Sequence, residues 1–149
     1  MAVLSVANHR RDDCFHINDK GEEVTFQLIP EYHLVSNAHF ILLQEPSKFC
    51  YLALEPSSVF SLNYEVIQTI ISNNPKLESQ RKVIFQRIMK QAFTRVESFV
   101  LLSPEARYEK YIKDFPNIVN RAPDKYIANV LGITPVSLSR IRKRISTKQ

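Results

Sequence analysis

Basic and hydroxyl side chains recur at helical spacing near the C-terminal end of the chain, between residues 136 and 144. At about 100° per residue, a helix here places Val136, Arg140 and Lys143 on one side, with other polar side chains flanking them. A guanidinium can bind guanine O6 and N7 through two hydrogen bonds, and basic side chains can bind phosphate. Such a face fits the major groove of duplex DNA. The sequence therefore predicts a DNA-binding surface made of Val136, Ser137, Ser139, Arg140, Lys143 and Arg144.

The residues of this surface differ in the DNA contact that we expect from each. Arg140 is the candidate for a base contact, whereas Val136 can touch only apolar atoms such as a thymine methyl group. Lys143 and Arg144 suit phosphates, which position a protein on DNA without reading its sequence. The serines can contact either bases or phosphates.

The other side of the same segment carries the residue types that a helix-turn-helix requires. In DKYIANVLGITPVSLSRI, residues 124–141, Gly132 occupies the turn, where glycine most easily adopts a left-handed backbone. Thr134 and Pro135 suit the cap and first position of the second helix. The apolar side chains expected to pack the two helices together are Ile127, Ala128, Leu131, Ile133, Leu138, Ile141 and Ile145. An ordinary helical hairpin inside a core is the structural alternative.

The net charge of +5 is concentrated at the C-terminal end. Residues 121–149 contain seven basic side chains and one acidic side chain, a net charge of +6. Residues 1–120 contain 13 basic and 14 acidic side chains, a net charge of −1. A localised basic stretch suggests a polyanionic partner, although a solvated basic tail would give the same composition.

Composition and spacing argue against several other classes of protein. No apolar run approaches the ~20 residues that cross a bilayer, and we expect no secretory signal. Cys14 and Cys50 lack CxxC spacing, so we expect free thiols in the cytoplasm and neither a disulfide nor a metal site. No nucleophile–base pair or phosphate-cradling glycine loop is visible, so the sequence predicts no enzyme and no cofactor. Metal-ligand spacing is also lacking among the histidines, His9, His16, His33 and His39.

The first 62 residues have the pattern of short strands and turns. Asp19-Lys20-Gly21 separates apolar runs at 14–17 and 24–29, which favours a β-hairpin. Turn-forming Glu-Pro-Ser triplets separate the next apolar runs, which lie at 39–43, 49–54 and 58–62. This spacing suits a compact antiparallel β unit.

Helical signals begin at Asn63, which can cap a short helix ending near Ile71. A long helix is expected from about 75 to 101, and Ser103 with Pro104 begins a further helix. The long helix carries an apolar stripe at steps of three and four, made of Phe85, Ile88, Met89, Ala92, Phe93, Val96, Phe99 and Val100. The stripe either packs on its own β unit or pairs with the same helix of a second chain, and we favour the dimer.

The segment LSPEARYEKYIKDFPNIVNRAPDKYIANVLGITPVSLSRIRKRI closely resembles the Crp/Fnr superfamily of bacterial regulators, above all the branch common in Bacteroidetes. Upstream, FHINDKGEEVTFQLIPEYHLVSNAHFILLQEPSKFCYLALEPSSVFSL resembles the later strands of that family's cyclic-nucleotide-binding-type β-roll. The resemblance covers nearly the whole chain from about residue 14. It implies an α+β fold, with a partial antiparallel β-roll over residues 1–74, a dimerization helix over 75–102, and a winged-helix type of helix-turn-helix over 103–149.

Several residues depart from the family pattern. Members usually carry a few dozen further residues before this point, so we expect either a shortened β-roll or a chain that is a fragment. Cyclic-nucleotide binders hold the phosphate with a Gly-Glu pair and an arginine, where this chain has Ser36-Asn37 and Ser47-Lys48. Without that clamp we expect no cyclic nucleotide, and two cysteines are too few for a four-thiolate cluster. Arg140 matches the family's base-contacting arginine, whereas Val136 replaces a frequent glutamate.

These observations lead to one main hypothesis and two alternatives. The main hypothesis is a cytoplasmic, homodimeric transcription regulator that binds a palindromic site on double-stranded DNA. RNA polymerase is a further candidate partner, and the residues do not identify a small-molecule effector. The first alternative is a protein-interaction or ligand-sensing module with vestigial DNA binding, which the shortened β-roll and Val136 favour. An enzyme is the least favoured reading.

Overall fold

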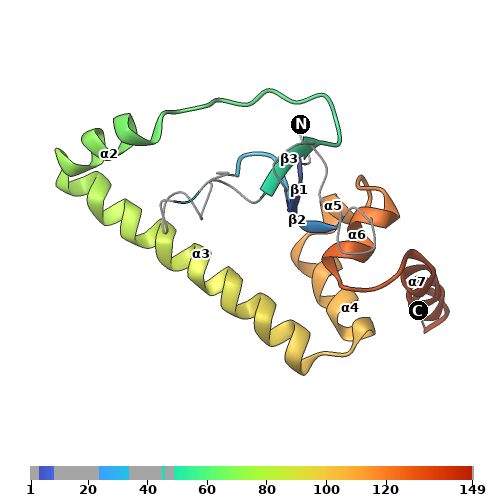
Figure 1. The fold of residues 1–149 in the computed structure, drawn as a ribbon. Helices are drawn as coiled ribbons and strands as arrows, with labels where there is room; N and C mark the ends of the chain where they lie inside the picture. Colours follow the sequence, from blue (N-terminus) through green and yellow to red (C-terminus); the bar gives the residue numbers. More distant parts are fainter. Residues whose placement is uncertain (1–3, 9–23, 34–44, 46–48, 149) are drawn as a thin grey trace. The chain divides into compact units, whose positions relative to one another are not determined.

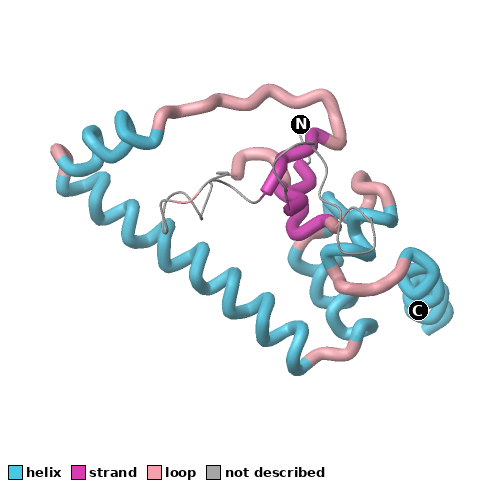
Figure 2. Tube along the Cα trace, viewed as in Figure 1, coloured by secondary structure: helices cyan, strands magenta, loops and turns pink. Residues whose placement is uncertain are grey.

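The computed structural model describes residues 4–8, 24–33, 45 and 49–148, and helices dominate these residues (Figures 1 and 2). The strands are β1 (Leu4–Asn8), β2 (Thr25–Ile29) and β3 (Phe49–Ala53). The helices are α2 (Tyr64–Ser72), α3 (Pro75–Leu101), α4 (Pro104–Asp114), α5 (Pro116–Val119), α6 (Asp124–Val130) and α7 (Pro135–Lys148). No helix in the described ranges is long and apolar enough to cross a membrane.

The three strands form one antiparallel sheet in the order β2-β1-β3. Leu4 of β1 lies opposite Ile29 of β2 and Ala53 of β3, so the N-terminal strand is the central one. The register between β1 and β2 shifts between Val6 and Ala7. The sequence predicts β2 and β3 but not β1, although β1 makes both of the sheet's pairings.

The predicted α+β fold with a partial β-roll is wrong, because the described residues are mainly helical and their strands form one small sheet of five-residue strands. Residues 58–62, predicted as a strand, have no regular structure and leave Val59 and Phe60 exposed. A strand needs a partner to satisfy its backbone groups, whereas a capped helix satisfies its own. The winged-helix type is also wrong, because residues 104–148 contain helices and turns but no strand.

Several predictions fall on residues outside the described ranges. They concern the turn Asp19-Lys20-Gly21, the strand at 39–43, the positions of the phosphate clamp, Cys14, and the histidines other than His33.

The chain divides into two compact units, one containing residues 1–58 and 104–149 and the other containing Val59–Ser103. In the second unit, Asn63 caps α2, since its Oδ1 accepts a hydrogen bond from the Glu65 amide at 2.8 Å. Asn74 caps α3 in the same way, with the Lys76 amide at 3.1 Å, and Pro75 follows as the first helical residue. These caps confirm the predicted starting points of both helices. Neither α2 nor α3 contains a buried residue.

The first unit contains a core built mainly by its C-terminal helices. Leu28 of β2 joins this core, whose other buried members come from α4 to α7 and the turns between them: Tyr108, Ile118, Ala122, Tyr126, Ile127, Ala128, Val130, Leu131, Leu138 and Ile141. The sheet is therefore attached to the helices by an apolar contact. An ionic contact reinforces it, because Arg121 binds Glu31 after β2 and Glu55 after β3.

Candidate nucleic-acid interface

The turn between α6 and α7 has the conformation that the sequence predicts. Gly132 has φ 65°, a left-handed value that a residue without Cβ adopts at little cost. Its amide donates to the Asn129 carbonyl at 2.9 Å, and the Ile133 amide donates to the Ala128 carbonyl at 3.0 Å. These two bonds satisfy carbonyl groups at the end of α6 and fix the direction in which α7 begins.

Thr134 caps α7. Its Oγ1 accepts a hydrogen bond from the Ser137 amide at 3.1 Å, while its carbonyl accepts one from the Leu138 amide at 3.0 Å. Pro135 occupies the first helical position, where its missing N–H leaves no bond unmade. The predicted cap is confirmed.

The inner faces of α6 and α7 form the best-buried part of the core. Ile127, Ala128 and Leu138 are fully buried. Leu131 and Ile141 are nearly so, and Ile133 and Ile145 pack against them. From α4, Nε of Arg107 donates to the Leu131 carbonyl at 3.2 Å, which ties the end of α6 to a third helix. The predicted inner face is therefore confirmed, and it holds α7 with one side toward solvent.

The outer face carries the predicted DNA-binding residues. Val136, Ser139, Arg140, Lys143 and Arg144 are exposed. Ser137 is half-buried, and its hydroxyl lies 2.9 Å from the Thr134 hydroxyl, so it serves the cap as well.

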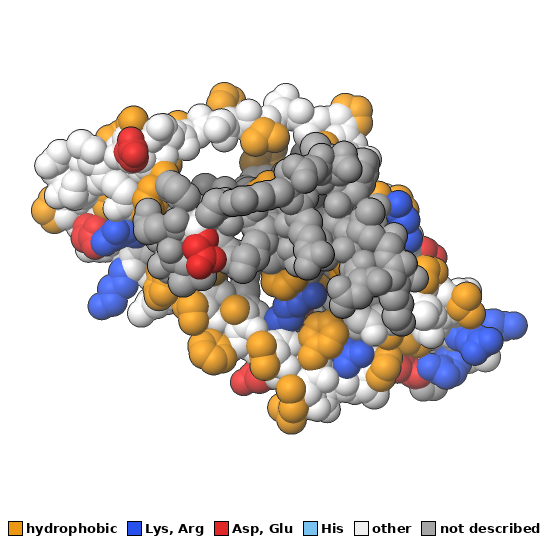
Figure 3. All heavy atoms as spheres, viewed as in Figure 1, with side chains coloured by type: hydrophobic (Ala, Val, Ile, Leu, Met, Phe, Trp, Pro, Cys, Tyr) orange, Lys and Arg blue, Asp and Glu red, His pale blue; other side chains and the backbone are white. Residues whose placement is uncertain are grey.

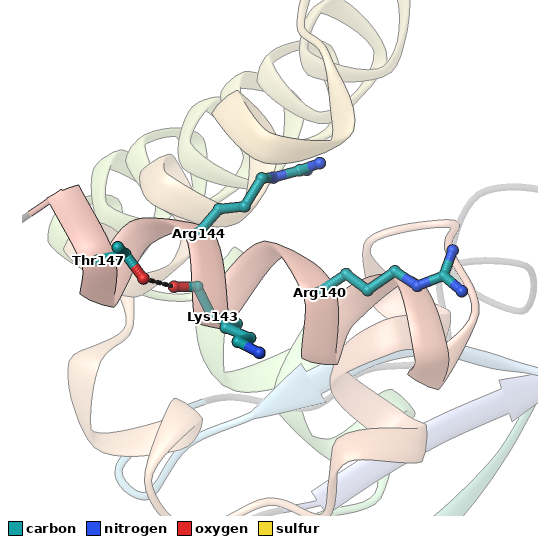
Figure 4. A pocket seen from close by; sticks show the side chains of 4 residues that line it. All are labelled: Arg140, Lys143, Arg144 and Thr147. Atoms are coloured by element: carbon teal, nitrogen blue, oxygen red, sulfur yellow. Dashed lines mark hydrogen bonds between the residues drawn. The ribbon is translucent and has the colours of Figure 1, made fainter.

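Three of these residues, Arg140, Lys143 and Arg144, together with Thr147, line one open groove of about 520 Å³ along α7, and their charged groups point in different directions from the helix (Figure 4). Thr147 was not among the predicted residues, although its spacing of seven from Arg140 places it two turns along the same face. Its hydroxyl donates to the Lys143 carbonyl at 2.8 Å. Val136, Ser137 and Ser139 do not line this groove.

The basic side chains of α7 differ in their partners. Arg142 is held on both sides, since Nε donates to the Tyr108 hydroxyl at 3.0 Å and Nη1 donates to Asp124 at 2.6 Å. Arg144 lies 2.9 Å from Glu105. Arg140 and Lys143 have no acidic partner in the described part of the chain. In Figure 3, Lys and Arg side chains gather at the lower right of the view.

The contacts of Arg142 give this residue a structural role. Burial alone would lower the pKa of Arg142, but its hydrogen bond to Tyr108 and its attraction to Asp124 raise that pKa overall. The charged guanidinium links α7 to α4 and α6 through these two partners. Sequence periodicity cannot reveal this role, because both partners lie on other helices.

The apolar stems of the lining side chains form most of the groove's wall, and three of these side chains end in cations, which favour an anionic partner. The ranges that the structure describes contain no group of three or more His, Cys, Asp or Glu side chains arranged to hold a metal ion. His33 lies near β2, where its Nδ1 is 3.0 Å from the Glu31 carbonyl.

A comparison with protein-family models finds no match for this chain, and a comparison with curated proteins finds none either.

Proposed function

We propose that this chain binds duplex DNA through the outer face of α7 and regulates transcription, as a regulator of the Crp/Fnr type acting in the cytoplasm. One observation carries the proposal: a helix seated by a fully buried inner face presents Arg140, Lys143, Arg144 and Thr147 together in an open groove. We assign it no catalytic role, no cofactor and no cyclic nucleotide.

The basic side chains of α7 have different partners, so we expect them to make different contacts with DNA. Arg140 is exposed and unpaired among the described residues, so its guanidinium is available for a bidentate contact with guanine. Lys143 lies one turn further along and suits a phosphate. Arg142 is committed to Tyr108 and Asp124, so it positions the helix and does not read DNA.

The test is to select binding sites from random duplex DNA and then to measure affinity by fluorescence anisotropy across salt concentrations. Arg140→Ala is expected to lose ~1–3 kcal/mol on the selected site and to relax one base position. Lys143→Ala should flatten the salt dependence of binding to any duplex. Lys110→Ala is the matched control, because it removes one positive charge from α4, where Lys110 pairs with Asp114.

Two results would contradict the proposal. One is the recovery of no preferred site together with weak, sequence-blind binding, which would favour a protein-interaction or ligand-sensing module with vestigial DNA binding. The other is an equal loss on selected and random DNA in Arg140→Ala, which would remove the base-reading role.

We further propose that the DNA-bound form is a homodimer joined through α3. Most of the apolar stripe of this 27-residue helix is solvent-exposed, with Phe93 64% and Val100 75% exposed, and the helix has no buried residue. Large exposed apolar patches are typical of protein interfaces, and a second copy presents a matching stripe. Two copies of α7 would then read a palindromic site with half-sites about one helical turn apart. RNA polymerase is a candidate partner of the bound dimer.

Sedimentation equilibrium tests the dimer. Val96→Asp places a charge in the stripe and should give a monomer with weaker DNA binding, since Val96 is exposed in one chain and its replacement spares the fold. Lys90→Asp, which changes charge off the stripe, is the control and should remain dimeric. A wild-type chain that stays monomeric at high concentration would refute this assembly.

A further inference from the structure

Arg144 forms an ion pair with an acid on α4 and also lines the groove on α7. Its Nη2 lies 2.9 Å from Oε2 of Glu105, which belongs to the first turn of α4. The same side chain lines the groove with Arg140 and Lys143, and it leaves α7 in a different direction from Lys143 (Figure 4). A carboxylate and a phosphate offer a guanidinium the same kind of anionic oxygen. The acid on α4 therefore holds Arg144 as a DNA phosphate would.

The pair between Arg144 and Glu105 is the exchangeable one among the contacts of α7. Arg142 is fixed by two partners, one of them the buried Tyr108. Arg144, by contrast, has a side chain that is 59% exposed, and the side chain of Glu105 is 24% exposed. Salt screens an ion pair whose guanidinium is this exposed, so an incoming phosphate can reach Arg144 and replace the carboxylate.

We propose that Glu105 is an internal competitor of the DNA backbone, which occupies Arg144 until a phosphate displaces it and so lowers the affinity for every duplex. This inference rests on the proposed DNA binding by α7. Because phosphate contacts carry no sequence information, Glu105 sets the strength of binding and leaves base preference to other residues.

The competition predicts a gain of binding when Glu105 is neutralised. Each phosphate contact changes the slope of log K against log salt by about 0.9 on duplex DNA, through release of counterions. Arg144 contacts a phosphate in both bound proteins, so Glu105→Gln adds no contact of this kind. The substitution is expected to raise affinity about three- to tenfold at low salt, with a gain that shrinks as salt screens the Glu105 pair. The gain should be the same on random DNA and on the selected site.

A double-mutant cycle separates this competition from a general charge effect. Wild type, Glu105→Gln, Arg144→Gln and the double variant are compared by anisotropy titration on random duplex DNA over a salt series. If Glu105 acts through Arg144, the gain disappears in the Arg144→Gln background. Asp114→Asn is the matched control, since it also neutralises an acid of α4, but one that pairs with Lys110 outside the groove. It should leave affinity within about twofold of wild type.

Glu105 also lies at the positive end of α4, where a carboxylate stabilises a helix, so thermal unfolding is recorded for each variant. Glu105→Asp is a second variant that keeps the charge at the helix start but shortens its reach toward Arg144, and it should give a smaller gain. Two results would overturn the competition but not the DNA binding of wild type. One is a Glu105→Gln variant with no gain in affinity, and the other is an equal gain in affinity in the Arg144→Gln background. If none of the four chains binds duplex DNA, the proposed function falls as well.

Discussion

Arg121 and Glu55, which are 66 residues apart in the chain, form a bidentate ion pair. Nε of Arg121 donates to Oε1 of Glu55 at 2.9 Å, and Nη2 donates to Oε2 at 2.8 Å. Nη1 of the same guanidinium donates to both carboxylate oxygens of Glu31, at 3.2 and 3.0 Å. All five donor positions of a guanidinium lie in one plane, so one side chain can hold two carboxylates at once. The contact joins two strand ends to the turn between α5 and α6.

We expect Arg121→Gln to destabilise the first unit. The substitution removes both ion pairs and leaves Glu31 and Glu55 facing each other without a cation between them. The measurement is the urea midpoint of unfolding, monitored by far-UV circular dichroism at neutral pH. Lys110→Gln, which breaks an exposed pair with Asp114 on α4, is the control and should cost only ~0.2–0.5 kcal/mol. An equal loss of stability in the two variants would show that the Arg121 contact stabilises the fold no more than an exposed ion pair does.

The same cluster predicts a loss of stability in acid. Arg121 lowers the pKa of Glu55 through its hydrogen bonds, and the pKa of Glu31 is lowered by its own backbone hydrogen bond and then by Arg121. A carboxyl group whose pKa is lowered by folding stabilises the fold above its unfolded pKa, and this contribution disappears as pH falls through the folded pKa. The urea concentration at the midpoint of unfolding should therefore decrease when the pH is lowered below about 4.5, which is the ordinary pKa of these groups. The fall should be shallower in Arg121→Gln, and parallel curves for the two proteins would contradict the assignment.

Leu138 and Val136 test which side of α7 holds the helix in place. Leu138 is fully buried between α6 and α7, so Leu138→Ala should cost ~2–5 kcal/mol in the free energy of unfolding. Val136 is 61% exposed, and Val136→Ala should stay within about 0.5 kcal/mol of wild type. Chemical denaturation of the two variants gives the comparison. Similar losses at both positions would mean that α7 does not bury the side described.

Gly132 tests the turn. At φ 65°, a Cβ crowds the following carbonyl, so Gly132→Ala should destabilise the chain by ~1–2 kcal/mol. Gly132→Asn should cost less, because asparagine visits the left-handed region more readily than alanine does. Urea midpoints of the three proteins provide the measurement. If alanine and asparagine cost the same, the left-handed backbone does not limit this position.

The sequence by itself determined the local features of the C-terminal helices and of α2 and α3. Asn63 and Thr134 cap their helices, and Gly132 makes the turn, because caps and turns depend on hydrogen bonds within a few residues. The inner face of α6 and α7 was equally predictable from spacing, since the residues of one helix face recur at fixed steps. The exposed positions of Arg140 and Lys143 follow from the same geometry.

The tertiary structure alone decided which strands pair and which charges are occupied. β1 lies between β2 and β3, and residues 58–62 form no strand, because strand pairing depends on partners distant in sequence. Arg140, Arg142 and Arg144 are indistinguishable by composition, yet Tyr108, Asp124 and Glu105 occupy two of them and leave Arg140 available. A helix's own sequence fixes where its side chains point, whereas the acids that meet them come from other helices, so only packing decides which cations are available to bind DNA.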